Sequence, residues 1–212
     1  MKRSAIAIAL GFGFALAAAP ADAQLVNFPT IGLPTGAPST FVAAQFGRGL
    51  NDTSGKTNAF GAFIGRTGIA DRVTVAAGVG MINYDPDAKY TFGGTAAIAV
   101  TAPEAATAIS VQAGLGYLSL ATDFSTMNIP IGVAVRRTIA SDSGNLGIWA
   151  MPRLNMTRVT VLGTTGSSTD FGVSGGAAFT TSGGFGFHAA LDMLATDPSA
   201  VVGGVGVHLM IG

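Results

Sequence analysis

The chain has 212 residues, of which 49% are hydrophobic and only 10% are charged, and its formal net charge at pH 7 is zero. An ordinary soluble domain carries about 25% charged residues, and the balanced charge offers no basic surface for nucleic acid. Cysteine is absent, which excludes disulfide bonds, a thiolate zinc site, a cysteine nucleophile and a lipid-modified cysteine.

Residues 1–23 have the layout of a secretory signal peptide. A positively charged start is followed by an apolar run at 5–19 and by the small-x-small cleavage motif Ala21-Asp22-Ala23. The apolar run is shorter than the ~20 residues that a membrane-spanning helix needs. We therefore expect export of the chain and cleavage before Gln24.

Residues 24–39 form a proline-rich leader that contains Pro29, Pro34 and Pro38. Proline lacks a backbone donor and disfavours a helix interior, so this spacing predicts an extended segment. From Thr40 onward, apolar residues alternate with small or polar ones, which is the period of a β-strand. The alternation predicts ten strands, at 40–50, 57–66, 72–83, 90–101, 107–119, 127–139, 146–157, 170–180, 184–193 and 200–211.

The connections between these strands alternate in length and polarity. The short ones are 67–71, 102–106, 140–145 and 181–183. The longer and more polar ones are 51–56, 84–89, 120–126, 158–169 and 194–199. This alternation indicates hairpins with two chemically different sets of turns at opposite ends. We expect an all-β fold at 40–212, an up-and-down antiparallel barrel of ten strands, or of eight if two hairpins are loops.

The two faces of the strands differ in residue size. In 72–84, Val75 and Val79 share one face, while Gly78 and Gly80 share the other. A soluble barrel would bury its apolar face and show charged residues to water, but the small-residue faces contain almost no Lys or Glu. An outer-membrane barrel places apolar side chains outside and smaller ones inside. Because lipid cannot satisfy backbone polar groups, such a sheet must close.

Aromatic residues gather near the predicted ends of the strands, as in the girdles that outer-membrane barrels carry at both interfaces. Five of them lie toward the longer connections and two toward the short turns. The predicted girdle consists of Phe46, Phe60, Phe92, Tyr117 and Phe171 at one end and Phe185 and Phe187 at the other.

The signal peptide, the turn and strand TGIADRVTVAAGVG at 67–80, and the ten-strand rhythm together resemble the small outer-membrane β-barrel proteins of Gram-negative bacteria. The resemblance covers the mature chain as a general pattern rather than a specific motif. It implies an outer-membrane location, contact with membrane lipid and lipopolysaccharide, and insertion by the barrel-assembly machinery. Such barrels usually end in an aromatic residue, whereas this chain ends in His208-Leu209-Met210-Ile211-Gly212.

One motif of hydrolases occurs in the chain. Gly172-Val173-Ser174-Gly175-Gly176 matches G-x-S-x-G, and Asp192 and His208 follow in hydrolase order. The motif acts only in a strained strand-to-helix elbow, whereas a strand and a turn are expected here. We therefore interpret this segment as a glycine-rich strand.

His188 and His208 are the only two histidines, and both fall on the inward face of neighbouring strands. A five-residue loop at 196–200 would set them directly opposite, ~5 Å apart at Cβ, and other registers would separate them. We interpret them as two separate polar lumen residues, with a metal-binding or pH-sensing pair as the alternative. Asp192 shares the face of His188 but is ~13 Å away along the strand.

Arg153 is assigned to the lumen by parity, because an arginine facing lipid at mid-strand costs ~2–4 kcal/mol. Small barrels have interiors just wide enough for side chains to fill, so we expect a hydrogen-bonded plug rather than an anion-selective ring. Arg66 and Arg72 flank a short turn, from which they can also reach the headgroup region. The candidates for lumen and constriction are Arg153, Arg136, Arg72, Gln112, Trp149, His188 and His208.

The sequence predicts an integral outer-membrane barrel with a structural role or a narrow, porin-like pore for small solutes. We expect no catalytic residues, no cofactor, no metal ligands and no nucleic-acid partner, while the oligomeric state stays open. The alternatives are a lipid-modifying or protease-type outer-membrane enzyme, which needs clustered His, Asp, Glu or Ser, and a secreted soluble barrel that binds a lipophilic ligand.

Overall fold

The computed structural model describes residues 38–52, 58–84, 87–102, 105–121 and 123–212. The signal peptide and the leader up to residue 37 lie outside the described residues. The strands in the described ranges are β1 Ser39–Gly49, β2 Asn58–Ile69, β3 Val73–Tyr84, β4 Asp87–Ala99, β5 Thr107–Ala121, β6 Phe124–Ser141, β7 Gly144–Val161, β8 Thr164–Thr181, β9 Phe185–Leu194 and β10 Ala200–Ile211. No helix in these ranges has the length and hydropathy required to cross a bilayer.

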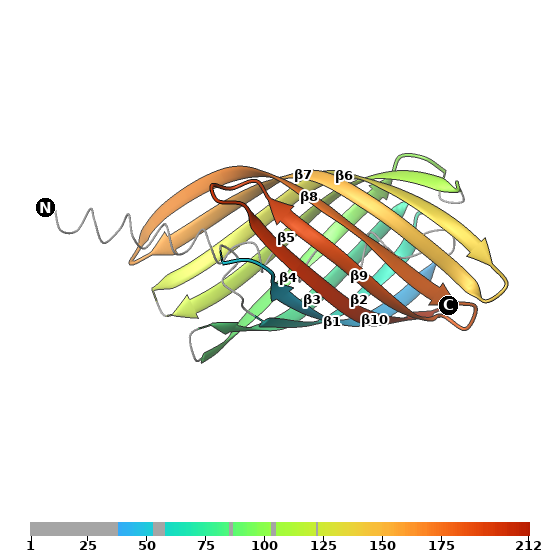
Figure 1. The fold of residues 1–212 in the computed structure, drawn as a ribbon, viewed down its shortest axis with the longest axis horizontal. Helices are drawn as coiled ribbons and strands as arrows, with labels where there is room; N and C mark the ends of the chain where they lie inside the picture. The colour runs from blue at the N-terminus through green and yellow to red at the C-terminus, as the bar shows by residue number, and fades with distance from the viewer. Residues whose placement is uncertain (1–37, 53–57, 85–86, 103–104, 122) are drawn as a thin grey trace, which may run out of the picture.

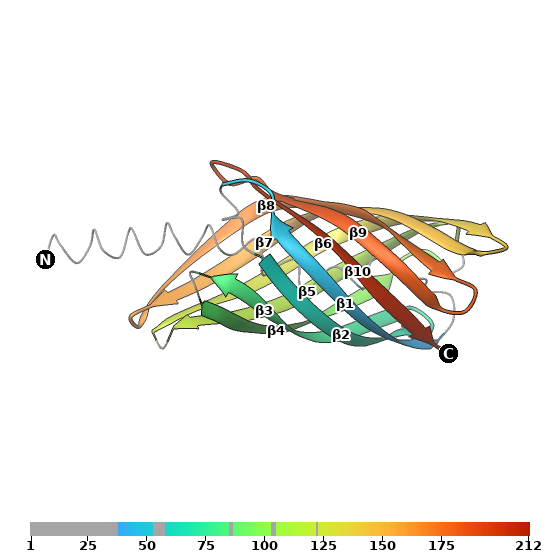
Figure 2. The ribbon, with the colours of Figure 1, turned by 60° about the horizontal axis from the view of Figure 1, so that its bottom comes forward.

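The sheet is a closed barrel, shown with its tilted strands in Figures 1 and 2. Each strand pairs antiparallel with its neighbours in the sequence, and β1 closes the ring on β10, with Thr40 opposite Ile211. The fold is therefore the predicted up-and-down antiparallel barrel, and the strand number is ten rather than eight. Among the ten described strands, closure leaves none at a sheet edge with unpaired backbone groups.

The predicted contrast between short and long connections is wrong. Only two residues separate β3 from β4, β5 from β6, and β7 from β8, where longer loops were expected. The polar segment 158–169 instead extends β7 and β8, and Leu162 and Gly163 form the turn with φ of 49° and 76°. Threonine and valine favour strands, and two positive φ values are the geometry of a tight hairpin turn.

Strands β6, β7 and β8 are consequently longer than predicted, with 18 residues each. In Figure 1 these yellow and orange strands reach beyond their neighbours at both ends of the barrel. The alternation of apolar and polar residues predicted strands in this region correctly. It did not predict their full length, because the ends of the strands are polar.

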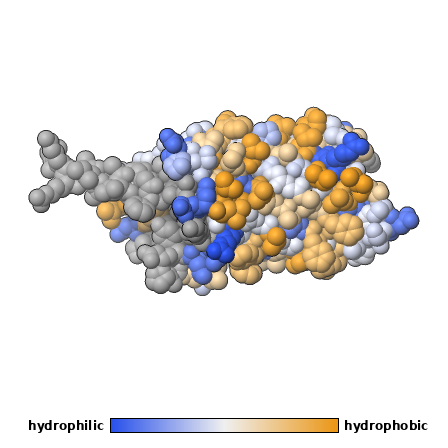
Figure 3. All heavy atoms as spheres, in the orientation of Figure 1, coloured by the Kyte–Doolittle hydropathy of each residue, from blue (hydrophilic) through white to orange (hydrophobic). Residues whose placement is uncertain are grey.

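Side chains alternate between the exterior and the lumen, as expected. The eight aliphatic residues Val75, Val79, Val111, Leu115, Ile131, Val133, Val205 and Val207 are all exposed on the outside. In Figure 3 the apolar residues gather over the middle of the barrel, with hydrophilic ones toward its two ends. The large apolar residues therefore face outward, which confirms the inverted arrangement predicted from the sequence.

Glycine on the inward face makes room for large side chains from neighbouring strands. A Cβ at Gly78 would collide with the buried ring of Phe63, and a Cβ at Gly65 would collide with the ring of Phe41. Two apolar clusters fill parts of the lumen in this way. One consists of Ala43, Ala59, Phe63, Ile82 and Leu118, and the other of Ala134, Trp149, Met151 and Ala190.

Candidate functional site

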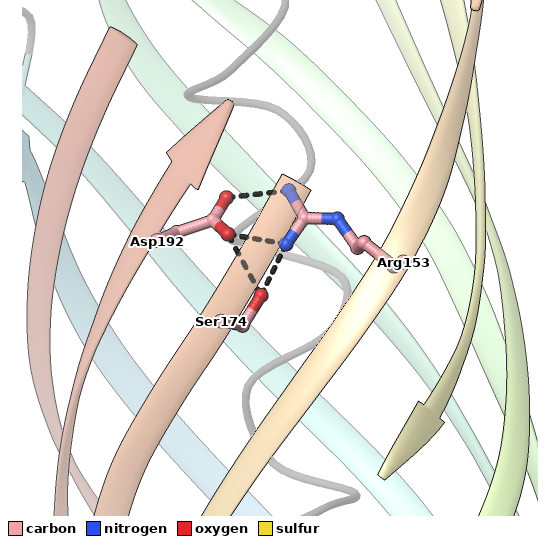
Figure 4. A network of polar contacts seen from close by, with 3 residues as sticks. All are labelled: Arg153, Ser174 and Asp192. Atoms are coloured by element: carbon pink, nitrogen blue, oxygen red, sulfur yellow. Dashed lines mark hydrogen bonds and ion pairs between the residues drawn. The ribbon is translucent and has the colours of Figure 1, made fainter. Parts of the chain in front are cut away.

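The polar network around Arg153 crosses three strands inside the lumen (Figure 4). Arg153 on β7 forms a two-pronged ion pair with Asp192 on β9, in which Nη2 donates to Oδ2 at 2.7 Å and Nη1 donates to Oδ1. Ser174 on β8 accepts a hydrogen bond from Nη1 and donates to Asp192 Oδ1 at 2.7 Å. All three residues are at most 4% exposed.

Strand register brings these three side chains together. Ser174 lies directly opposite Asp192, while Arg153 lies opposite Gly172, two residues earlier on β8. A Cβ at Gly172 would lie 3.4 Å from the Arg153 guanidinium carbon. The tighter contacts of such a Cβ would be with Leu194 Cδ2 at 2.8 Å and the Met193 carbonyl oxygen at 3.0 Å, both on β9.

Most of the predicted lumen residues are buried inside the barrel. Arg153, Arg136, Gln112, Trp149, His188 and His208 all have inward parity and are at most 7% exposed. Arg72 differs, since it is exposed in the turn before β3, where Nη1 donates to the Val100 carbonyl at 3.4 Å. Arg66 also points outward, opposite Val75. Both lie near a strand end, where an arginine can reach polar headgroups.

Trp149 and Met151 on β7 fill the lumen next to Arg153. A Cβ at Gly176, which lies opposite Trp149 on β8, would be 2.5 Å from the Ala190 Cβ on β9. The missing side chain at Gly176 thus lets β7 and β9 residues meet in one cluster with Ala134. The apolar cluster and the charged network are therefore neighbours along the inward face of β7.

His188 and His208 form the second polar contact of interest. They are not directly opposite, because His188 faces Gly206 and His208 faces Gly186. Their Nδ1 atoms nevertheless approach to 3.3 Å, and His208 Nε2 lies 2.8 Å from Thr180 Oγ1. The interpretation as two separate lumen residues is therefore wrong, since the diagonal between offset positions brings the rings together.

The serine of the G-x-S-x-G segment lies on strand β8. Ser174 bonds to Asp192 and Arg153, whereas His208 contacts Thr180 and His188. Ser174, Asp192 and His208 occur in the order of a hydrolase triad, but the histidine belongs to a different contact from the other two. Among the described residues, no group of three or more His, Cys, Asp or Glu is arranged to hold a metal ion.

The predicted girdle residues all face the exterior. Phe46 packs against Phe60 at a ring-centroid distance of 5.4 Å, and Phe92 packs against Tyr117 at 5.0 Å. Phe185 and Phe187 pair at 5.0 Å near the other end, and Phe171 is exposed on β8. These contacts form aromatic pairs on the outer wall, as a membrane interface favours.

Two features of the structure were missed in the sequence. Tyr90 is 75% exposed and continues a cross-strand row from Phe60 through Met81. Tyr90 is two residues from Phe92 on the same strand, and this spacing alone places both rings on the same face. Asp192 was assigned to the lumen without a partner, although Arg153, Ser174 and Asp192 share the inward face of three consecutive strands.

No protein-family model matches the chain, and no curated protein matches its sequence. Solved structures of similar shape include two bacterial β-barrel domains. The N-terminal β-barrel domain of Pseudomonas aeruginosa OprF matches at 18% identity and a TM-score of 0.41, over 82% of this chain and 97% of that domain. The translocator domain of the autotransporter NalP from Neisseria meningitidis matches at 13% identity and a TM-score of 0.49, over 98% and 97%.

Proposed function

We propose that this chain is an integral outer-membrane β-barrel whose lumen is a narrow pore for small solutes, with its constriction at Arg153. The observation that carries the proposal is the buried Arg153–Ser174–Asp192 network, which places charged groups on the inner wall of a closed barrel with an apolar exterior.

The membrane location is supported by the distribution of side chains. Exposed valine, leucine, isoleucine and phenylalanine cover the outer wall, while arginine, glutamine, asparagine and threonine lie inside. Water would penalise such an exterior, whereas lipid favours it. The signal-peptide layout of residues 1–23 supports export to the outer membrane, where lipid and lipopolysaccharide would surround the barrel and the assembly machinery would insert it.

A narrow pore is supported by the side chains that fill the lumen. Ten strands enclose more space than the eight whose interior is just filled, but Trp149, Met151 and the arginine network occupy one side of it. Solutes that pass would be small. A purely structural barrel is the second candidate, because the two apolar clusters also stabilise the wall.

The proposal includes no enzymatic activity. A lipid-modifying or protease-type barrel would need a nucleophile beside a base. Ser174 instead bonds to an ion-paired carboxylate, and the two histidines contact each other and Thr180. An assay of the refolded barrel with phospholipid and peptide substrates should detect no turnover.

The test is single-channel conductance of the refolded protein in planar bilayers. We expect a small conductance for the native chain and a larger one for Arg153→Ala, since the guanidinium no longer occupies the lumen. The ion pair is neutral, so removal of Arg153 leaves Asp192 uncompensated and should shift selectivity toward cations. Arg153→Ala with Asp192→Ala should widen the pore without that shift.

Arg158→Ala is the matched control, because Arg158 lies on the same strand but points outward. Its conductance should equal that of the native chain. A native chain that stays closed under all voltages, together with a closed Arg153→Ala variant, would exclude the pore and favour the structural barrel.

A further inference from the structure

The lumen brings the only two imidazoles of the chain into contact. The ring centroids of His188 and His208 are 5.6 Å apart, while their Nδ1 atoms are 3.3 Å apart. The rings therefore approach through their Nδ1 edges rather than through their faces. Two nitrogen donors converge on one point of the inner wall, where both residues are at most 7% exposed.

Each histidine has space because it faces a glycine. A Cβ at Gly206 would collide with the His188 ring, and a Cβ at Gly186 would collide with the His208 ring. In this reciprocal arrangement of two histidine–glycine pairs, both imidazoles lie along the wall and meet on the diagonal between the strands. A larger residue at either glycine would push one ring away from the other.

Thr180 is placed to select the tautomer of His208. When Thr180 Oγ1 accepts the Nε2 proton across its 2.8 Å contact, Nδ1 of His208 keeps its lone pair toward His188. Histidines that bind metal usually donate the N–H of their other ring nitrogen to an oxygen acceptor, which fixes the tautomer and the ring orientation. Thr180 is itself buried, opposite Gly186 on β9.

We propose that His188 and His208 form a binding site for one divalent transition ion of the class that imidazole prefers, such as Cu²⁺ or Zn²⁺. With metal–nitrogen bonds of ~2.0–2.1 Å, a 3.3 Å separation of the two Nδ1 atoms corresponds to an angle of roughly 104–111° at the metal. That angle is close to the tetrahedral value found in Zn²⁺ sites, and Cu²⁺, which prefers a tetragonal arrangement, serves below as the spectroscopic probe.

Occupancy of this site breaks the hydrogen bond between the two Nδ1 atoms, and the proton of His188 moves from Nδ1 to Nε2, so the net number of protons does not change. The ion lies off the line between the two nitrogens, so both rings turn about χ2, a torsion with broad freedom in histidine. His188 carries its proton on Nε2 when Nδ1 binds the ion, and both imidazoles stay neutral. Water molecules would supply the remaining ligands.

The test titrates Cu²⁺ into the refolded, untagged mature barrel and follows binding by calorimetry. One ion should bind per chain, and Zn²⁺ should compete for it. His188→Gln and His208→Gln should each lose this binding. The electron paramagnetic resonance spectrum of the native barrel should show coupling to two imidazole nitrogens, a measurement that needs no variant to fold.

Thr180→Val should weaken the site by about 10-fold or more, as loss of a partner behind a metal ligand typically does. Thr95→Val is the matched control, because Thr95 is a buried lumen threonine on β4, on the opposite wall of the barrel. Its affinity should be unchanged.

Absence of binding to the native barrel, or equal binding by the variant with both histidines replaced by glutamine, would overturn the proposal. An affinity unchanged by Thr180→Val would overturn the assignment of Nδ1 as the ligand atom. A spectrum without imidazole coupling would exclude the site even if calorimetry detected bound copper.

Discussion

At the scale of single residues, the alternation of side chains along a strand determines whether a substituted side chain lies on the outer wall or in the lumen. Val133 and Ala134 are neighbours on β6, yet Val133 is 45% exposed on the outer wall and Ala134 is buried in the lumen cluster. The same chemical change therefore has different consequences one residue apart.

Val133→Arg should destabilise the folded barrel by ~2–4 kcal/mol, because it places a charge against lipid near the bilayer centre. Urea unfolding in lipid vesicles measures the change. Thr164→Arg, an exposed position at the tip of the β7–β8 hairpin, should cost almost nothing. Equal destabilisation by the two arginines would contradict the assigned membrane depth.

Gly132→Ala should destabilise the barrel by ~1–3 kcal/mol through overpacking. The new Cβ would lie 2.7 Å from the Pro152 carbonyl oxygen and 2.8 Å from the Arg153 Cβ, where the backbone cannot move freely. Gly175→Ala points outward and meets only the Trp149 carbonyl oxygen at 3.4 Å. It should be neutral or stabilising, and a reversed order in the same unfolding assay would contradict the assigned facing.

At the scale of elements, the strands of the β7–β8 hairpin are longer than the apolar pattern predicted. Its pairing runs without interruption from Gly144 opposite Thr181 to Val161 opposite Thr164. Leu162 at the tip is 75% exposed and has a positive φ of 49°. A tight turn, rather than a polar loop, therefore sets the length of both strands.

Gly163→Val should destabilise this hairpin by ~1–2 kcal/mol, because a β-branched residue is strained at a φ of 76°. Leu162→Asn should act in the opposite direction, since asparagine tolerates positive φ in hairpin turns. Hydrogen exchange of the β7 and β8 amides would register both effects. Faster exchange in the Leu162 variant would argue against this turn geometry.

At the scale of the whole molecule, the single tryptophan reports which side of the wall faces lipid. Trp149 is 5% exposed and lies in the lumen. Lipids with brominated acyl chains should leave its fluorescence unquenched, because the barrel wall separates the indole from the bilayer.

A matched probe places the tryptophan outside. The double variant Trp149→Phe with Phe92→Trp moves the indole to an exposed position on β4, and the same lipids should quench it strongly. Quenching of the native chain together with protection of the double variant would mean that Trp149 faces outward and residue 92 faces the lumen. That is the arrangement of a soluble barrel that binds its ligand inside.

Local periodicity in the sequence predicted ten strands, with eight left open, and the outward direction of the aliphatic residues. Those features follow from the period of two and from the difference in size between Val75 or Val79 on one face and Gly78 or Gly80 on the other. Both are local properties of the sequence. Parity also placed Arg153, Trp149 and Gln112 in the lumen before any pairing was known.

Only the tertiary structure decided which lumen residues meet. The contact of Arg153 with Asp192 and that of His188 with His208 both run diagonally across strands, and a diagonal depends on register. Register depends in turn on hairpin length, and the sequence pattern predicted loops that were too long after β3, β5 and β7. Threonine and serine stabilise strand pairing as valine does. This pairing determined where the strands end, and therefore which side chains lie next to each other across the lumen face.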